Sequence, residues 1–313
     1  MQSALATSAV EPGSAPRPFL KWAGGKRQLL PQLRRFVPPI IGAYHEPFVG
    51  SGAVFFDLWV RGCVDGGRAR LSDTNADLIG CYRAVVRDVD GLVEHLRELA
   101  RRHARSPAKH YYRVRDELFN PGRRTWAAAD VPGEYPTELA AMFIYLNRTG
   151  FNGLFRLNGQ GGFNVPAGRY TNPQICDAPA LTAAARALGS PGVELAVASY
   201  ESVLSAATRG DFVYFDPPYA PLTTTARFTS YTATGFGDDD QRQLREVVFA
   251  LVDRGCFVTL SNSTADIIEE LYDNRRAVRV GLRAHRVPAR RAINSDPTRR
   301  GDVMEYIITN VHR

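Results

Sequence analysis

The sequence predicts an α/β protein built on a largely parallel sheet, and two stretches carry that prediction. Residues Phe212–Phe215 form an apolar run of aromatic and β-branched residues, which suits a buried strand. The run stops at Asp216, where two prolines forbid both helix and ladder pairing, so we expect the chain to leave the sheet there. Residues 44–58 have the pattern of a strand, a turn containing Gly50 and Gly52, and a helix.

A second predicted strand, Ala69–Leu71, ends near Asp73. Nucleotide-binding α/β sheets place an acidic residue about 20 residues beyond the glycine turn, where it accepts hydrogen bonds from ribose hydroxyls. The spacing Phe48-x-Gly50-x-Gly52 lacks the third glycine of the G-x-G-x-x-G dinucleotide fingerprint. We therefore expect an adenosine-bearing cofactor without a pyrophosphate, rather than NAD.

The residues that follow the central strand predict a small-molecule site. Ligands of open α/β sheets bind at the carboxyl ends of the strands. An ionised Asp216 only accepts hydrogen bonds, Pro217 offers a carbonyl and no N–H, and Tyr219 offers an aromatic face. Together these groups fit a planar ring that carries an exocyclic amine. An ordinary turn, with Asp216 capping a backbone amide, also explains the residues Asp216–Tyr219 when they are taken alone.

Composition narrows the class of protein. The 313 residues, 44% of them apolar, suffice for one large domain or two smaller ones. The net charge of +7 points to a polyanionic partner. The chain has neither a signal-peptide pattern nor an apolar run long enough for a membrane span, so we expect no membrane association. Four scattered cysteines predict neither a zinc site nor a disulfide scaffold: Cys63, Cys81, Cys176 and Cys256.

Residues 19–26, F-L-K-W-A-G-G-K, hold two of the three lysines in a chain that otherwise uses arginine. The glycine pair lets the backbone approach a ligand closely. Trp22 and Lys26 could reach that ligand by stacking and by charge. A turn before a helix, with lysines clustered by chance, is the alternative.

The remaining elements alternate between helical and extended patterns. A helical stretch from about Leu78 to Glu117 has a local excess of positive charge, which a solvated helix face also explains. A helix is predicted to begin near Asp238, because its acidic first turn suits the helix dipole. Further strands are predicted at Val193–Ala198, Phe257–Leu260 and Val303–Thr309. Residues 223–231 form a threonine-rich loop, and residues 275–300 are rich in arginine.

Residues 147–170 are rich in glycine and asparagine. Two short runs, Gly153–Leu157 and Gly162–Val165, flank Asn158–Gly161 and predict a β-hairpin. The segment carries side chains suited to the DNA major groove, where Arg pairs with guanine and Asn with adenine: Phe151, Asn152, Arg156 and Arg169. A surface hairpin without a ligand is the alternative.

Taken together, these motifs resemble the DNA adenine methyltransferase (Dam) family, the S-adenosylmethionine-dependent N6-adenine methyltransferases of the D12 class. Six segments match in the family's order: F-L-K-W-A-G-G-K at 19, E-P-F-V-G-S-G at 46, D-T-N-A-D-L-I at 73, N-R-T-G-F-N-G at 147, F-N-V-P at 163 and D-P-P-Y-A-P-L at 216. The resemblance implies a Rossmann-like methyltransferase fold, a mixed sheet with helices on both faces. It also implies an inserted, mostly helical target-recognition domain that carries the hairpin.

The resemblance also implies domain bounds and residue roles. Residues 1–17 are expected to form a disordered tail, 18–80 and 190–313 the catalytic domain, and 81–189 the recognition domain. The catalytic residues at a flipped adenine would be Asp216, Pro217 and Tyr219. The cofactor would contact Trp22, Lys26, Phe48, Gly50, Asp73 and Asp216. DNA would contact Lys21, Phe151, Asn152, Leu154, Arg156, Pro166 and Arg169.

The implied reaction is methyl transfer from S-adenosylmethionine to adenine N6 in double-stranded DNA, with GATC as the favoured target and no metal. The family's hairpin aromatic is often tyrosine, so Phe151 keeps a stacking face and lacks the hydroxyl. We expect a cytoplasmic monomer of bacterial or phage origin, with a cognate restriction endonuclease as a further partner. The alternatives are adenine methylation in another sequence, methylation of cytosine N4 or an RNA base, and a catalytically silent DNA-binding protein.

Overall fold

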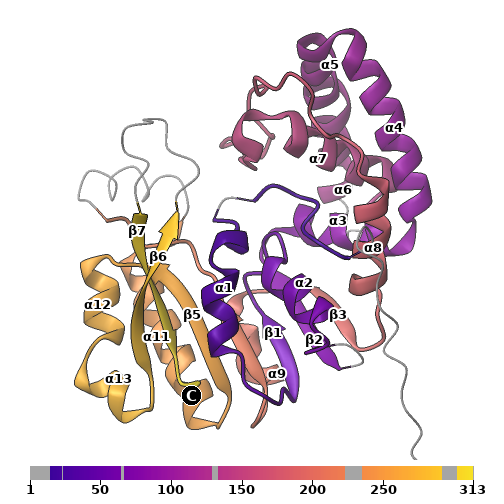
Figure 1. Cartoon of the computed structure of the whole chain (residues 1–313). Coiled ribbons are helices and arrows are strands. Elements are labelled where there is room, and N and C mark those ends of the chain that lie inside the picture. The colour runs from indigo at the N-terminus through magenta and orange to yellow at the C-terminus, as the bar shows by residue number, and fades with distance from the viewer. Residues whose placement is uncertain are drawn as a thin grey trace, which may run out of the picture. The chain divides into compact units, whose positions relative to one another are not determined.

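The computed structural model describes residues 15–22, 24–64, 67–128, 133–222, 235–290 and 302–312. The chain forms two compact units (Figure 1). One, the helical unit, comprises residues 1–23 and 80–190; the other, the sheet unit, comprises 24–79 and 191–313. The predicted catalytic and recognition roles of such units stay predictions. Most of the predicted tail (1–14), all of the threonine-rich loop (223–231) and part of the arginine-rich stretch (291–300) lie outside the described residues.

The sheet unit contains a seven-stranded sheet with the order β3-β2-β1-β4-β5-β7-β6 (Figure 1). Strands β1 to β5 run parallel, and β7 runs antiparallel to its neighbours β5 and β6. The bounds are β1 Ala43–Glu46, β2 Arg68–Asp73, β3 Val193–Val197, β4 Phe212–Phe215, β5 Phe257–Ser263, β6 Arg283–Arg290 and β7 Asp302–Thr309. This mixed sheet confirms the predicted fold class.

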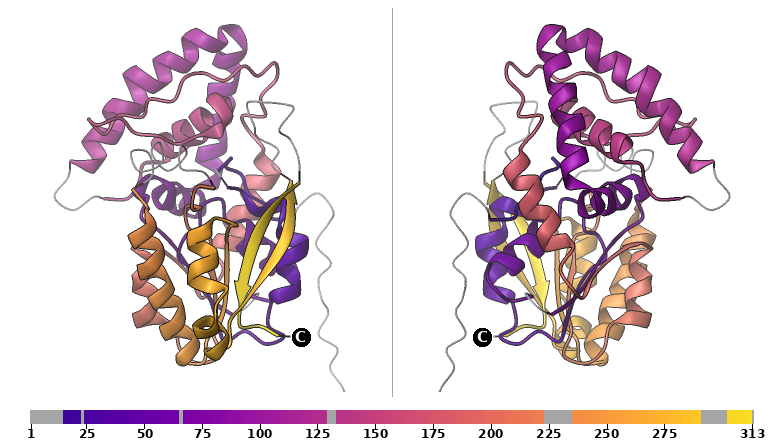
Figure 2. Two further views of the ribbon diagram at one scale, coloured as in Figure 1. Left: turned by 90° about the vertical axis from the view of Figure 1, so that its left-hand side faces the viewer. Right: turned by 90° about the vertical axis from the view of Figure 1, so that its right-hand side faces the viewer.

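Helices pack on both faces of the sheet (Figure 2). Because side chains alternate along a strand, Val213 and Phe215 of β4 point to one face, where they share a core with α11 and α12. On the other face, the Thr259 hydroxyl donates a hydrogen bond to the carbonyl of Phe36, at the end of η2. The helices of this unit are η1 Lys26–Gln28, α1 Leu30–Leu33, η2 Arg34–Phe36, α2 Ala53–Val60, η5 Tyr200–Ser202, α9 Val203–Ala206, α11 Asp238–Asp253, α12 Asp266–Tyr272 and α13 Arg275–Arg279.

The turn between β1 and α2 requires glycine. Gly50 and Gly52 have φ angles of 47° and 66°, in the left-handed region that favours glycine. Gly52 is also the N-cap of α2. The strand, turn and helix predicted for residues 44–58 are therefore present.

The described part of the helical unit is built from α-helices, a π-helical segment (η3) and a short 3₁₀ helix (η4). The stretch predicted as helical from Leu78 to Glu117 is divided, because Asp88 caps a new helix by accepting a hydrogen bond from the Gly91 N–H and Pro107 begins another. The helices are α3 Ala76–Arg87, which links the two units, α4 Val89–Arg105, α5 Pro107–Arg113, η3 Val114–Phe119, α6 Asn120–Ala127, α7 Thr137–Thr149, η4 Phe151–Gly153 and α8 Ala178–Leu188.

The segment 147–170 reverses direction as expected, but its two arms are not regular strands. The turn is closed by the Asn158 N–H, which donates to the Gly162 carbonyl at 2.8 Å. Antiparallel pairing is limited to isolated bridges between Gly150 and Ala167 and between Leu157 and Phe163. We call this segment the recognition loop.

Side chains of neighbouring helices hold the second arm of the recognition loop. Asn120 of α6 donates to the Phe163 carbonyl at 3.1 Å and accepts from the Phe163 N–H at 2.8 Å. The Tyr111 hydroxyl of α5 donates to the Val165 carbonyl at 2.9 Å. These bonds tie the arm 163–165 to the helices through backbone groups on the side of the arm that faces away from Leu157.

Strand β6 was not predicted. It lies within the arginine-rich stretch and pairs with β7 along its whole length. None of the described helices is long and apolar enough to cross a membrane.

Candidate active site

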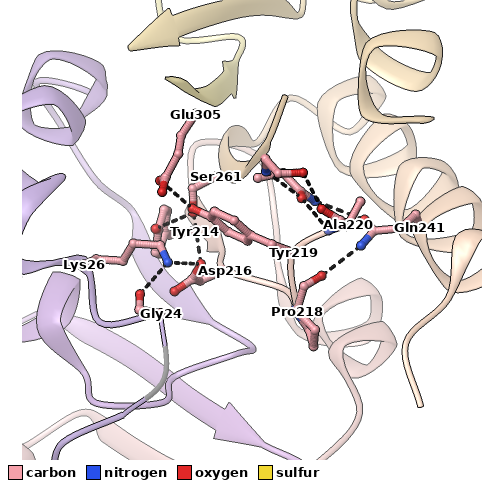
Figure 3. Close-up of polar contacts among 12 residues, drawn as sticks. Gly24, Lys26, Tyr214, Asp216, Pro218, Tyr219, Ala220, Gln241, Ser261 and Glu305 are labelled. Carbon is pink, nitrogen blue, oxygen red and sulfur yellow. Dashed lines mark hydrogen bonds and ion pairs between the residues drawn. The ribbon is translucent and has the colours of Figure 1, made fainter. Parts of the chain in front are cut away.

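Asp216 lies directly beyond the end of β4 and forms the centre of a polar cluster (Figure 3). Lys26 Nζ lies 2.7 Å from Asp216 Oδ1, and the two side chains are 7% and 20% exposed. The Ser261 hydroxyl, at the neighbouring end of β5, donates to the same oxygen at 3.1 Å. No described residue donates a hydrogen bond to Asp216 Oδ2. One carboxylate oxygen is thus held by the protein, and the other remains available as an acceptor.

The loop after Asp216 is fixed by polar side chains from β5 and α11 (Figure 3). Asn262 Oδ1 accepts from the Ala220 N–H at 3.1 Å, and the Ser263 hydroxyl donates to the Ala220 carbonyl at 2.6 Å. Gln241 Nε2 donates to the Pro218 carbonyl at 2.9 Å. No described residue donates to the Pro217 carbonyl, so this carbonyl and Asp216 Oδ2 are two acceptors of the loop without a donor among the described residues.

The side chain of Tyr219 has contacts at its ring face and at its hydroxyl. Lys26 Nζ lies 4.5 Å from the centre of its ring, and its hydroxyl donates to Glu305 Oε2 at 3.0 Å. Lys26 also donates to the Gly24 carbonyl at 2.6 Å, which fixes the ammonium between the glycine turn and Asp216. The structure therefore brings together Lys26, Asp216 and Tyr219, while the roles that the family resemblance implies for them at the cofactor and the adenine stay predictions.

Burial sets the protonation of this cluster. Burial raises the pKa of the Asp216 carboxyl above its ordinary value, while the charge of Lys26 and the hydrogen bonds from Lys26 and Ser261 oppose that rise. Burial also raises the pKa of Tyr219 well above its ordinary value, so the phenol stays protonated. Lys26 is the cation that favours an ionised Asp216 in this low-dielectric site.

Gly50 and Asp73 meet at the carboxyl ends of β1 and β2. The Gly50 N–H donates to Asp73 Oδ2 at 3.3 Å, and the Asn75 N–H donates to Oδ1 at 2.9 Å. Burial raises the pKa of Asp73, and these backbone donors oppose the rise. A carboxylate oxygen can accept more than one hydrogen bond, so Asp73 can also accept hydrogen bonds from a ligand. The geometry fits two neighbouring hydroxyls of a ribose.

Phe48 belongs to an aromatic cluster beside that turn. Its ring is stacked on Tyr200, with 5.4 Å between ring centres, and it makes edge contacts with Phe215 and Phe236. Phe48 is only partly buried. The cluster offers an apolar surface suited to a planar base.

Glu46 was not singled out from the sequence. It is the last residue of β1 and precedes the turn that contains Gly50. Glu46 is 2% exposed and accepts hydrogen bonds from the Tyr44 hydroxyl at 2.8 Å and the Phe55 N–H at 3.1 Å. Burial raises its pKa to about 8. The side chain joins β1 to the first turn of α2, and its position before Pro47 in the glycine-turn motif was the signal that could have found it.

Trp22 and Lys21 belong to the helical unit. The ring of Trp22 is stacked on Phe155, with 6.1 Å between ring centres. The Lys21 N–H donates to Asn147 Oδ1 at 2.8 Å, and its ammonium lies 3.9 Å from the centre of the Tyr170 ring. The predicted cofactor contact of Trp22 and DNA contact of Lys21 stay predictions.

The recognition loop exposes most of its predicted DNA-binding side chains. The side chains of Asn152, Arg156, Pro166 and Arg169 are exposed, Leu154 is half-buried, and Phe151 is 48% exposed. Arg156 Nε donates to Asn164 Oδ1 at 2.8 Å, which orients the guanidinium. An exposed aromatic ring beside exposed arginines is the combination that the DNA-binding prediction requires.

Comparison with known proteins identifies the family. Residues 22–293 match the family described as D12 class N6 adenine-specific DNA methyltransferase. The Type II methyltransferase M1.LlaDCHI of Lactococcus lactis subsp. cremoris is 38% identical over 94% of this chain and 95% of its own length. The chain belongs to the D12 class of N6 adenine-specific DNA methyltransferases. The Type II methyltransferase M.MjaIII of Methanocaldococcus jannaschii is 39% identical over 94% of this chain and 99% of its own, and the DNA adenine methylase of Escherichia coli K12 is 36% identical over 93% and 94%.

Membership establishes the reaction class. The protein is an adenine-specific DNA methyltransferase, DNA is its substrate, and the family implies S-adenosylmethionine as the methyl donor. The mixed sheet is the methyltransferase fold expected from the sequence. Within the described residues no cluster of three or more His, Cys, Asp or Glu side chains is arranged to hold a metal, and the expectation of a metal-free reaction stays a prediction.

The structure places further residues at this site that sequence reasoning did not single out. They are the side chains that hold the Asp216 loop: Gln241, Ser261, Asn262, Ser263 and Glu305. A polar Ser261-Asn262 pair at the end of a predicted strand was visible in the sequence, but nothing local linked it to Asp216.

The base of the recognition loop supplies a stability prediction for this methyltransferase. A Cβ on Gly153, whose φ is +64°, would lie 2.4 Å from Lys21 Cβ. Gly153→Ala should lower the free energy of unfolding of the helical unit by about 1–3 kcal/mol, because it combines strain with a clash. Thermal unfolding measures this. Gly159→Ala, where a Cβ would meet nothing within 4 Å, should unfold like the wild type, and equal melting of both variants would contradict the account.

Proposed function

We propose that this methyltransferase transfers a methyl group from S-adenosylmethionine to N6 of an adenine extruded from duplex DNA, with GATC as its target. The observation that supports the proposal is a pair of acceptors beside the Tyr219 ring, Asp216 Oδ2 and the Pro217 carbonyl, to which no described residue donates. An adenine amine has two hydrogens to donate, and its ring has a face to stack. An adenine therefore matches the two acceptors and the aromatic ring together.

The cofactor site would be formed by residues at the carboxyl ends of β1, β2 and β4. S-adenosylmethionine, when bound, supplies a methyl group carried on a positively charged sulfonium. Asp73 would accept hydrogen bonds from the ribose hydroxyls, Gly50 would let the backbone approach the nucleoside, and Phe48 would pack against the base. Trp22 and Lys26 complete the proposed set.

Asp216 and Pro217 would prepare the amine for attack. The N6 lone pair is delocalised into the adenine ring, which makes it a poor nucleophile. Hydrogen bonds from the amine to Asp216 Oδ2 and the Pro217 carbonyl would favour a more pyramidal nitrogen and direct its lone pair. After methyl transfer the nitrogen would release one of these two hydrogens as a proton. Lys26 and Ser261 hold the carboxylate in place. The protein thus contributes proximity and preorganised electrostatics, without a covalent enzyme intermediate.

Extrusion of the target base needs compensation. Removing a base from the helix costs a few kcal/mol. Stacking on Tyr219 would return about 1–3 kcal/mol. Phe151, exposed on the recognition loop, would stack in or beside the vacated position. Because Phe151 has no hydroxyl, it would contribute there through stacking of its ring and not through a hydrogen bond.

The target sequence would be read by the recognition loop together with Lys21. The proposed DNA contacts are Lys21, Phe151, Asn152, Leu154, Arg156, Pro166 and Arg169. A relative of 36% identity is named DNA adenine methylase, and the loop resembles that of GATC-reading members. Two other relatives are named Type II methyltransferases. The cognate restriction endonuclease, the monomeric state and the cytoplasmic location stay predictions.

Arg156 supplies a specificity prediction. Arg156→Ala should relax discrimination at one guanine of the target by about 1–3 kcal/mol, because a bidentate contact to that base is lost. Relative kcat/KM values on GATC and on duplexes with single-base changes measure this. Arg156→Lys keeps the charge without the planar fork and should relax specificity similarly. An equal loss on every duplex, rescued by lysine, would make Arg156 a phosphate contact instead.

Labelled methyl transfer tests the proposed function. The protein is incubated with labelled S-adenosylmethionine and unmethylated duplexes, one containing GATC and the others single-base variants, and the nucleosides are separated. We expect N6-methyladenine confined to GATC. N6-methyladenine in another sequence would overturn the target assignment, and label in cytosine would overturn the proposed chemistry.

A further inference from the structure

We propose that Glu305 is a positioning residue for methyl transfer, which fixes the Tyr219 ring against the extruded base. The inference rests on the proposed function and extends it to a residue on the antiparallel part of the sheet. Glu305 is not adjacent in sequence to any other residue of the site. Only the pairing of β7 with β5 brings it to the catalytic edge.

The sheet register delivers Glu305 to the site. Glu305 of β7 pairs with Ser263 of β5, two residues beyond Ser261, which contacts Asp216. It also pairs with Val287 of β6, so strands flank it on both sides. A carboxylate on a strand paired at both edges has a fixed backbone, and its side chain can locate a partner accurately.

The contact limits the remaining freedom of Tyr219. The backbone beyond Tyr219 is held by the Asn262 and Ser263 bonds to Ala220, and two prolines precede it. The side-chain torsions of Tyr219 are not fixed by these bonds. Its hydroxyl bond to Glu305 Oε2, at 3.0 Å, restrains the far end of the ring, while Lys26 lies 4.5 Å from the ring centre. A ring restrained at its hydroxyl presents one face for stacking.

The chemistry of the pair suits this role. Because the phenol of Tyr219 stays protonated, it can donate to a carboxylate continuously, and a hydrogen bond to a charged acceptor is stronger than one between neutral groups. Glu305 has no other hydrogen bond or ion pair from the described residues. Among the described residues, Tyr219 is therefore the partner that the Glu305 side chain restrains.

A double-mutant cycle tests the inference. Glu305→Ala, Tyr219→Phe and the double variant each should lower the single-turnover methylation rate by about tenfold, because all three remove the same charged hydrogen bond. The KM for S-adenosylmethionine and the Kd for the duplex should change little. Glu305→Gln keeps an acceptor for the hydroxyl and should recover most of the rate. Thermal unfolding checks that each variant is folded.

A matched control removes a similar contact elsewhere. The Tyr306 hydroxyl donates to Glu269 at 3.3 Å on the exposed side of α12, so Glu269→Ala should leave the rate unchanged. Additive losses in the double variant, or a Glu305→Gln rate as low as that of Glu305→Ala, would overturn the positioning role. Asp216→Ala is measured in parallel: retained transfer there would contradict the proposed function, whereas an unchanged Glu305→Ala rate would contradict only the role of Glu305.

Discussion

Asp216→Ala is expected to abolish methyl transfer while the protein still binds its duplex. The variant removes the acceptor proposed for one amine hydrogen and the partner of Lys26. Loss of one preorganised group of this kind lowers kcat by about 10²–10³-fold. Single-turnover transfer from labelled S-adenosylmethionine measures the rate, and fluorescence anisotropy of a labelled duplex measures binding.

Asp216→Asn provides the matched comparison for that result. Removing a buried carboxylate leaves Lys26, 7% exposed, without its ion partner, and an uncompensated buried charge costs about 3–5 kcal/mol of folding free energy. An asparagine carbonyl can still accept from Lys26, so this variant should be better folded. Its amide cannot accept from the amine at the second position, so it should also be inactive. Near wild-type turnover in either variant would contradict the mechanism.

Lys26→Met is expected to move the pH dependence of methylation. The charge of Lys26 lowers the pKa of Asp216 against the raising effect of burial. Without that charge the pKa rises further, and an ionised Asp216 requires a higher pH. The acid limb of kcat/KM, measured from pH 5 to 10, should therefore shift upward, with activity at neutral pH reduced and partly recovered at high pH.

The free energy of unfolding of Lys26→Met should fall as the pH rises. A carboxyl whose folded-state pKa is raised favours the protonated folded form, so stability is lost as the pH rises through that raised pKa. At neutral pH the loss should reach about 3 kcal/mol, because a buried partner has been removed. Arg27→Met, an exposed cation next in sequence, is the control and should change neither profile. An unchanged acid limb in Lys26→Met would show that Lys26 does not set the ionisation of Asp216.

The parts of the fold that local chemistry dictates could be predicted from sequence. All four residues of Phe212–Phe215 are buried in β4, as their apolar character indicated. Gly50 and Gly52 adopt positive φ angles that few other residues tolerate, so the turn after β1 was evident from their spacing. Lys26 and Asp216 were placed together only through the family resemblance, because their pairing joins distant segments.

Strand β6 escaped prediction because its charges conceal its alternation. Val287 and Ala289 are buried between exposed Arg286 and Pro288, which is a period of two. Pro288 disfavours a strand, because proline has no N–H to donate to a ladder. β6 is the last strand of the sheet, where one side has no neighbour and proline is tolerated.

The supporting residues of the site depend on strand register, which no local pattern supplies. Ser261 reaches Asp216 because β4 and β5 pair in parallel, with Phe215 opposite Leu260. Glu305 reaches Tyr219 because β7 returns antiparallel beside β5. In the recognition loop, the sequence suggested regular strands, but pairing is limited to two isolated bridges and the second arm is also bound by helix side chains.

The central claim is that an extruded base stacks on Tyr219 at the Asp216 loop, and photo-cross-linking tests it most directly. A duplex carrying 5-iodouracil in place of the target adenine is irradiated with the protein, and the attached residue is mapped by mass spectrometry. The account predicts a cross-link to Tyr219 that disappears when the iodinated base is moved outside the target. A cross-link confined to the recognition loop, with none at Tyr219, would contradict it.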